Sequence, residues 1–203
     1  MLVHLIRHGQ TNWNEEHRAQ GHSESALTSL GKQQAAALGA DLSQRNINKV
    51  YCSGSVRTRE TADQLFIDST PEIHYLDSLK EIHLGSWEGR LYSDIKIDSP
   101  EDFHHFWHQP HLFSVAGAES FYELQKRALQ ALFEICKKTQ DTEIAIISHG
   151  ALIKSLLCHY EDRPLSGLWD PPKMHNCAHS ILELDSNARG YIIQYAGMTM
   201  DVT

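Results

Sequence analysis

Short apolar runs alternate with segments of helical pattern in the first part of this chain. Residues 2–7 form an apolar run that predicts a buried strand, and a shorter run at 50–52 predicts a second one. Thr28 is suited to cap an alanine-rich helix that extends to about Ser43. Another helix is expected over residues 55–66.

The same alternation continues after residue 120. Ser120 and Glu123 match a capping box, which predicts a helix that ends near Gln140. The run at 144–147 predicts a strongly buried strand, and a new helix is expected to begin at Gly150 directly after it. The chain thus returns to a strand that leads straight into a helix.

Two closing strands are expected at 180–184 and 191–195, around a turn at 187–190. Strands that alternate with helices predict an α/β fold, here a three-layer α/β/α sandwich with a mostly parallel central sheet. In such sheets, ligands bind beyond the carboxyl ends of the strands. Polar residues at those ends are therefore the first place to look for chemistry.

Composition fits one folded domain over residues 1–203. The hydrophobic fraction of 41% is enough for a sizeable core, and the sequence shows no repeat or low-complexity tract. The segment at about 82–117 is irregular, with glycines, prolines, aromatic residues and histidines, and we expect it to form a lid or insertion.

Charge and cysteine usage restrict the partners and the location. The formal net charge of −8 argues against nucleic acid or an anionic membrane as a partner. No apolar run is long enough to span a membrane, and the beginning of the chain does not resemble a signal peptide. The four cysteines are widely spaced, so we expect reduced thiols and a cytoplasmic location. An acidic protein that binds phosphate must gather cations locally.

Two strands end in similar tripeptides, Arg7-His8-Gly9 and Ser148-His149-Gly150. Glycine allows the backbone to approach an anion closely, and arginine offers a fork of donors that matches phosphoryl oxygens. A nearby guanidinium also keeps a histidine neutral and therefore nucleophilic. Each tripeptide alone is a weak signal, but two such strand ends side by side would face each other.

Arg57 and Glu81 are the remaining candidates for chemistry. Arg57 falls in the first turn of the helix expected at 55–66, where it would either be a solvated surface charge or supply a second cation at the strand ends. A carboxyl group near a phosphate can protonate the leaving oxygen and later activate water. Glu81 and Glu88 lie in the same segment, and the local sequence does not choose between them.

The segment Leu5–Asn14 resembles the signature of the histidine phosphatase superfamily, which has the phosphoglycerate mutase-like fold. The resemblance continues in order through Gln20-Gly21, Leu27–Gly31, Ser53–Ala62, Leu79–Gly89, Glu119-Ser120 and Ser148–Gly150. Ordered motifs over nearly the whole chain are far more specific than Arg-His-Gly alone.

This resemblance implies a role for each matching residue. His8 would form a phosphohistidine and Glu81 would donate the proton, while Arg7, Arg57 and His149 would bind phosphoryl oxygens. Positions that line the family's phosphate pocket are matched by Asn14, Gln20, Gly21 and Gly150. No metal and no cofactor is implied, because the arginines and the second histidine neutralise the charge.

The expected function is a phosphomonoesterase that hydrolyses small phosphorylated metabolites, similar to α-ribazole phosphatases and broad-specificity phosphatases. A cofactor-dependent phosphoglycerate mutase is the alternative. It would need extra cations around its substrate, yet Arg90 and Lys96 are the only Lys or Arg residues between Glu81 and Ser120. A non-catalytic phosphate-binding protein would be expected to lose His8 or Glu81. The natural substrate and the oligomeric state stay open, with a homodimer as one option.

His104 and His108 have the i, i+4 spacing of metal ligands on a helix. No cysteine or H-E-x-x-H motif accompanies them, so we favour an exposed, aromatic-rich lid over a zinc site. The aromatic residues of this segment, Phe103, Phe106, Trp107 and Phe113, would either line a leaving-group pocket or cover the core.

Overall fold

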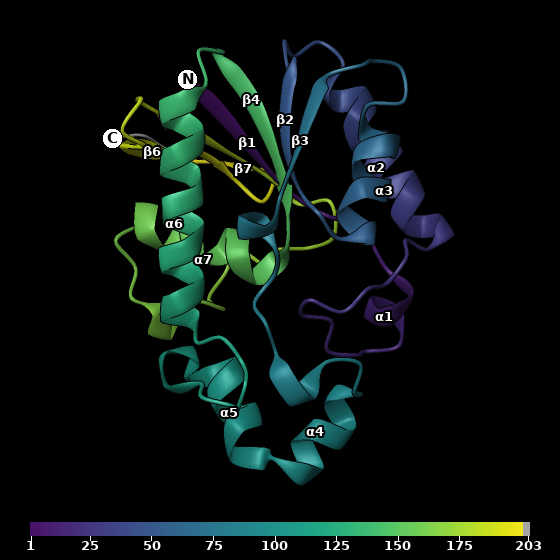
Figure 1. Ribbon diagram of the computed structural model, residues 1–203, viewed down its shortest axis with the longest axis vertical. Coiled ribbons are helices and arrows are strands. Elements are labelled where there is room, and N and C mark those ends of the chain that lie inside the picture. Colours follow the sequence, from purple (N-terminus) through teal and green to yellow (C-terminus); the bar gives the residue numbers. More distant parts are fainter. Residues whose placement is uncertain (201–203) are drawn as a thin grey trace.

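The computed structural model describes residues 1–200, so the last three residues of the expected domain at 1–203 lie outside the described part. In this part the strands form a single sheet of order β3-β2-β4-β1-β5-β6-β7. The strands are β1 Leu2–Arg7, β2 Lys49–Ser53, β3 Glu72–Leu76, β4 Glu143–Ser148, β5 His179–Leu184, β6 Gly190–Tyr195 and β7 Met198–Thr199. Figure 1 shows β1 to β4 converging toward the centre of the molecule, where their carboxyl ends meet.

The sheet is parallel on one side and antiparallel on the other. Strands β3, β2, β4 and β1 are parallel neighbours, whereas β5, β6 and β7 are each antiparallel to the strand before them in the sheet. The expected mostly parallel sheet is thus confirmed for the half that carries Arg7 and Ser148 at its strand ends. The closing pair β5 and β6 also occurs where it was predicted.

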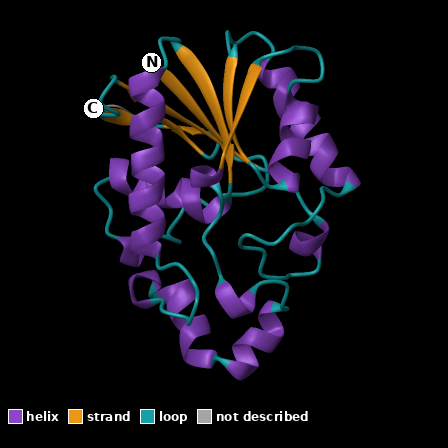
Figure 2. Ribbon diagram, viewed as in Figure 1, coloured by secondary structure: helices purple, strands orange, loops and turns teal. Residues whose placement is uncertain are grey.

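Helices cover both faces of the sheet, as Figure 2 shows. The helices are α1 Asn12–Glu15, α2 Ser29–Leu42, α3 Val56–Leu65, α4 Tyr92–Asp98, α5 Pro100–His108, α6 Phe121–Lys138 and α7 Gly150–Tyr160. Short 3-10 turns occur at Asp77–Leu79, Gly85–Trp87, Pro110–Leu112 and Leu165–Gly167. Among the described residues, no helix has both the length and the apolar character needed to cross a bilayer.

Alternation along the central strands explains the two covered faces. In β1, Val3 and Leu5 pack with α6 and α7, while Ile6 packs with α2 and α3 on the opposite face. In β4, Ile146 and Ile147 divide in the same way. Successive side chains of a strand point to opposite faces, so an entirely apolar strand requires helices on both sides. This confirms the three-layer α/β/α prediction.

Three strands or helices outside the cap were missed by the sequence analysis: β3, α1 and the two-residue strand β7. Strand β3 lies at the edge of the sheet and is mostly exposed or half-buried, so its residues Glu72–Leu76 lack the apolar signal of β1 and β4. Helix α1 is only one turn long, and a capping box between Thr11 and Asn14 holds it. None of these elements is both long enough and apolar enough to show a hydrophobic period in the sequence.

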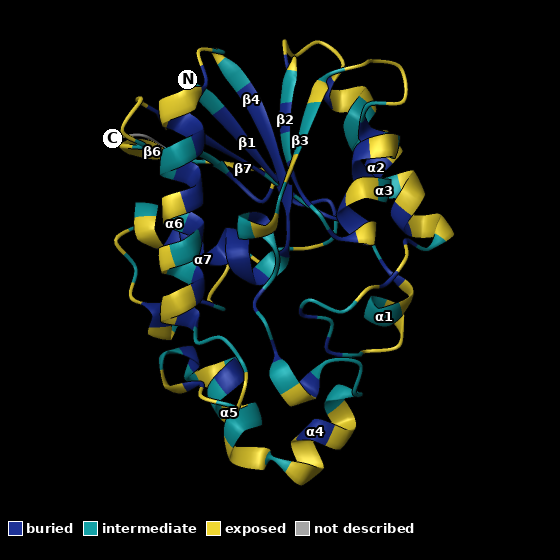
Figure 3. Cartoon of the chain, in the orientation of Figure 1, coloured by how far each residue is buried: buried dark blue, intermediate teal, exposed yellow. Residues whose placement is uncertain are grey.

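The segment 82–117 forms a cap beyond the carboxyl ends of the parallel strands, where Figure 1 shows α4 and α5. Figure 3 shows buried residues on the inner side of α4 and α5 and exposed residues on the outer side. Phe106 and Phe113 are buried with Trp87 in a cluster of aromatic rings. His104 and His108 contact each other, with ring centroids 4.9 Å apart, and both are exposed.

Candidate active site

The ends of β1 and β4 bring two histidines together. Arg7 is the register partner of Ser148, so His8 and His149 follow at equivalent positions of adjacent parallel strands. Their ring centroids are 5.4 Å apart, and the planes are inclined at 62°. The expectation that the two strand ends face each other is therefore met.

His8 is held as a neutral imidazole with one defined nitrogen free. It is 3% exposed, and its Nδ1 donates to the carbonyl oxygen of Gly9 over 2.8 Å. Burial, followed by the charges of Arg57 and Arg7, lowers the pKa of His8 well below its usual value. Because Nδ1 carries the proton, the lone pair resides on Nε2, which is the arrangement that a nucleophile needs.

Arg57 is completely buried in the first turn of α3. Its two terminal nitrogens donate to the carbonyl oxygens of Ser23 and Gly21 at 2.9 and 2.7 Å. Gly21 has a φ of +54°, and a Cβ there would collide with Glu88, so glycine is required at this turn. Burial lowers the pKa of Arg57 to about 10, which still leaves the guanidinium charged at neutral pH.

His149 lies behind Arg57. It is fully buried, its Nδ1 accepts from Arg57 Nε at 3.2 Å, and its Nε2 contacts Ser53 Oγ at 2.8 Å. Since Nδ1 is the acceptor, Nε2 carries the hydrogen and donates to the serine. Burial, then Arg57 and His8, lower the pKa of His149 well below its usual value. In this conformation both ring nitrogens are occupied by protein partners, and His149 does not line the cavity.

Arg7 provides the second guanidinium. One terminal nitrogen donates to the carbonyl oxygen of Met174, while Nε is buried and has no partner among residues 1–200. Burial lowers the pKa of Arg7, although Glu81 and Tyr92 oppose this shift. A Cβ at Gly150 would lie 3.3 Å from Arg7 Nε, so the glycine at the start of α7 leaves room beside this donor.

The structure distinguishes between the two glutamates. Glu81 lines the cavity, and its carboxylate accepts from the backbone nitrogens of Ala151 and Leu152, at the N-terminus of α7, at 3.0 and 3.1 Å. Glu88 instead accepts from His22 N, Ser23 Oγ and Leu84 N. Burial opposes ionisation of Glu88, but these hydrogen bonds outweigh it and lower the pKa. Glu88 therefore supports the loop that carries Gly21.

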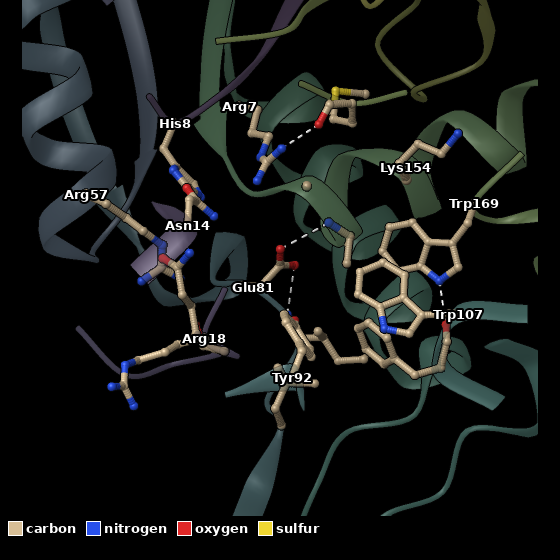
Figure 4. Close-up of a pocket in the computed structure, with 18 of the residues that line it drawn as sticks. Arg7, His8, Asn14, Arg18, Arg57, Glu81, Tyr92, Trp107, Lys154 and Trp169 are labelled. Carbon is tan, nitrogen blue, oxygen red and sulfur yellow. Dashed lines mark hydrogen bonds between the residues drawn. The ribbon is translucent and has the colours of Figure 1, made fainter. Parts of the chain in front are cut away.

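Figure 4 shows Arg7, His8, Arg57 and Glu81 around one cavity of about 440 Å³. Eight of the nine predicted site residues line it, with His149 as the exception: Arg7, His8, Asn14, Gln20, Gly21, Arg57, Glu81 and Gly150. Gln20 Oε1 accepts from Ser25 Oγ at 2.7 Å and from Thr11 Oγ1 at 3.2 Å. Segments far apart in the sequence thus converge beyond the strand ends.

The opposite wall of the cavity was only partly foreseen. Phe106 and Trp107 line it, as the leaving-group hypothesis expected, whereas Phe103 and Phe113 pack with the core. Additional lining residues that the sequence analysis did not select are Arg18, Ile82, Leu84, Tyr92, Ala151, Lys154, Trp169, Lys173 and Met174. Trp169 is in contact with Trp107, with ring centroids 5.4 Å apart. The run Trp169–Pro172 is the local sequence feature that could have indicated an ordered loop here.

Two of the three additional cations are already paired with protein groups. Lys154 Nζ donates to the carbonyl oxygens of Asp170 and Pro172 at 2.6 and 3.1 Å. Arg18 donates to Gly89 O and to the carboxylate of Glu16. Lys173 is exposed at the rim of the cavity. In residues 1–200, no three His, Cys, Asp or Glu side chains are grouped so that they could hold a metal ion.

Comparisons with known proteins agree with this geometry. YhfR of Bacillus stearothermophilus has a solved structure that superposes with a TM-score of 0.93 at 35% identity and covers 98% of both chains. Phosphoserine phosphatase 1 of Hydrogenobacter thermophilus is 28% identical over 89% of this chain and 85% of its own. A Salmonella choleraesuis protein named "Probable phosphoglycerate mutase GpmB" is 29% identical over 97% of this chain and 93% of its own.

The family model described as "Histidine phosphatase superfamily (branch 1)" matches residues 3–193. This range contains the carboxyl ends of the parallel strands β1 to β4 and all the cavity residues described above. The phosphoglycerate mutase-like fold inferred from the ordered motifs is confirmed by the superposition with YhfR. The chain belongs to the histidine phosphatase superfamily.

Proposed function

We propose that this protein is a metal-independent phosphomonoesterase in which His8 accepts the phosphoryl group. The observation that carries this proposal is a buried, neutral His8 whose Nδ1 is tied to Gly9, beside two guanidinium groups in one cavity. A histidine with only Nε2 free is suited to in-line attack on phosphorus. Arg7 and Arg57 stabilise the negative charge of the transferring group.

The reaction has two steps that balance in atoms and protons. In the first, His8 Nε2 bonds to phosphorus, the ester P–O bond breaks, and the protonated carboxyl of Glu81 gives its proton to the leaving oxygen. In the second, the Glu81 carboxylate takes a proton from water while the water oxygen attacks phosphorus. The N–P bond then breaks, which releases inorganic phosphate and returns His8 and Glu81 to their starting states.

The aromatic wall supports substrates with an apolar or aromatic leaving group. Tyr92, Phe106, Trp107 and Trp169 line the cavity opposite the strand ends (Figure 4). Rings of this kind bind flat apolar groups through their faces and edges. We therefore propose small phosphate monoesters with such groups as the preferred substrates.

A phosphoglycerate mutase is the second candidate, because one relative carries that name. Retention of a bisphosphorylated acid would require several free cations near the leaving group. Lys154 and Arg18 are already bonded to protein carbonyls, which leaves Lys173 at the rim. The small number of free cations in the cavity therefore favours a phosphatase over a mutase.

A substrate panel tests the proposal. We expect His8→Ala to lose hydrolysis of 1-naphthyl phosphate, phosphoserine and 3-phosphoglycerate alike, and the wild-type rate to survive exhaustive chelation. Rapid conversion of 3-phosphoglycerate into 2-phosphoglycerate, after priming with 2,3-bisphosphoglycerate, would instead assign the protein as a mutase.

A cytoplasmic location is part of the proposal, supported by four cysteines that are all buried and without a disulfide bond. Fractionation of cells that produce the protein at its natural level, with the thiols counted in the recovered material, tests it. Light scattering, which measures the molar mass in solution, tests whether the protein is a homodimer.

A further inference from the structure

The loop before β5 forms hydrogen bonds, through residues 174–177, at the end of the cavity where His8 lies. Met174 accepts a hydrogen bond from Arg7, and the backbone nitrogen of Cys177 donates to the carbonyl oxygen of His8 at 3.2 Å. Between them, the side chain of Asn176 donates through Nδ2 to Asn14 Oδ1 at 3.1 Å and to the His8 carbonyl at 3.4 Å. This loop was not selected by the sequence analysis.

The contacts of Asn176 fix the orientation of two amide groups in turn. The carbonyl oxygen of His8 can only accept, so Asn176 must present its NH2 end on that side. The same NH2 group faces Asn14, which must therefore present its oxygen. The backbone nitrogen of Thr11, which can only donate, lies 3.1 Å from the same Asn14 Oδ1 and requires the same orientation.

The consequence concerns the other end of the Asn14 amide. With Oδ1 occupied by two donors, Nδ2 is the end that remains, and it has no acceptor among the described residues. Asn14 lines the cavity next to His8 and Arg57 (Figure 4). A rotated amide would place N–H groups against two other donors and an oxygen toward the phosphoryl group, which is unfavourable on both sides.

We propose that Asn176 is a positioning residue for phosphoryl binding, because it holds Asn14 so that Nδ2 donates to a phosphoryl oxygen. This proposal rests on the proposed function and names a residue that acts through Asn14. Asn176 does not line the cavity whereas Asn14 does, so its effect on a bound anion must be transmitted by Asn14.

A double-mutant cycle tests the proposal, with the inhibition constant of orthovanadate as the readout. We expect Asn14→Ala to raise this constant about tenfold, since a hydrogen bond to a charged group is lost, and Asn176→Ala to raise it about fivefold. The double variant should resemble Asn14→Ala alone, because residues that act as a unit are not additive. Additive effects, or an unchanged constant in Asn176→Ala, would overturn the proposal.

Controls separate positioning from folding. His175→Ala changes an exposed neighbour in the same loop and should leave the orthovanadate constant unchanged. If Asn176→Ala does not fold, Asn176→Ser keeps a donor near the His8 carbonyl but is too short for Asn14, so it completes the same cycle. The proposed function fails in a different way, namely if the wild-type protein neither hydrolyses phosphate esters nor binds orthovanadate.

Discussion

At the strand ends, the cavity is built from buried polar groups that hydrogen-bond to the backbone or to one another. Arg57 and His149 are completely buried there, and His8 is nearly so. On the opposite side, the wall consists of half-buried aromatic rings such as Trp107 of the cap and Trp169 of the loop before β5, whose planes are inclined at 43°. The first region requires exact geometry, whereas the second tolerates ligands of different shape. Chemistry and recognition are therefore carried by separate parts of the molecule and should respond separately to substitution.

Loss of the nucleophile should have the largest effect at the strand ends. We expect His8→Ala to lower kcat by at least about 10³-fold for every phosphate ester, because the residue forms the bond to phosphorus. Steady-state kinetics on two unrelated esters measures this. His104→Ala, in the exposed part of α5, is the matched control and should retain wild-type kcat. A variant His8→Ala that keeps wild-type turnover would refute the mechanism.

Replacement of Glu81 should separate proton donation from phosphate binding. Glu81→Gln keeps the shape but removes the acid, so kcat/KM for an alkyl phosphate should fall by roughly 10²-fold. The loss should be much smaller for 4-nitrophenyl phosphate, whose leaving group departs without a proton. Equal losses for both esters would show that Glu81 acts through structure rather than through proton transfer.

The buried histidines should make the sheet region sensitive to acid. Burial, followed by His4, lowers the pKa of His179 to about 3, so the unfolded chain, with an ordinary histidine pKa near 6.5, binds a proton that the folded chain excludes. The contribution of His179 to the free energy of unfolding is therefore present above about pH 6.5 and is lost as the pH falls below that value. Between pH 6.5 and pH 5 the loss is about 2 kcal/mol for this residue.

Urea unfolding at pH 7.5, 6 and 5 measures this dependence. His4, whose Nδ1 lies 2.8 Å from His179 Nε2, shares the same burial and adds to the slope in the same direction. His179→Gln should reduce the slope, while His104→Ala in the cap should leave it unchanged. An identical slope in His179→Gln and in the wild-type protein would contradict the assignment.

Substitution in the cap should have the smallest and most selective effect. Trp107→Ala removes part of the aromatic wall, and we expect kcat/KM for 1-naphthyl phosphate to fall about tenfold. Phosphoserine, which has no ring, should lose less than about threefold on the same scale. Equal losses for the two substrates would mean that the cap and the strand ends are not independent.

The strand-end region could be predicted from the sequence because its residues follow strongly apolar strands. Arg7 ends β1 and His8 follows it, while His149 follows β4, so the register of two parallel strands brings them together. Arg57 was a candidate from its position in the first turn of a helix, and the family resemblance selected it. Glu81 could be preferred over Glu88 only through the family resemblance, since both lie in a segment without regular structure.

A lid at 82–117 was expected, but its internal arrangement and the loop before β5 could not be predicted, because they depend on contacts between distant residues. Trp169 donates from its indole nitrogen to the carbonyl oxygen of Phe106, and Asn176 reaches Asn14 across a separation of 162 residues.

The contact between Trp107 and Trp169 also gives the protein an optical property. Two of its four tryptophans line the cavity, while Trp87 is 1% exposed in the core. An aryl ligand that enters the cavity is expected to come near both indoles and alter their emission, whereas neither Trp13 nor Trp87 lines the cavity. Intrinsic fluorescence can therefore follow ligand occupancy in real time without a label, and Trp107→Phe should remove much of that signal.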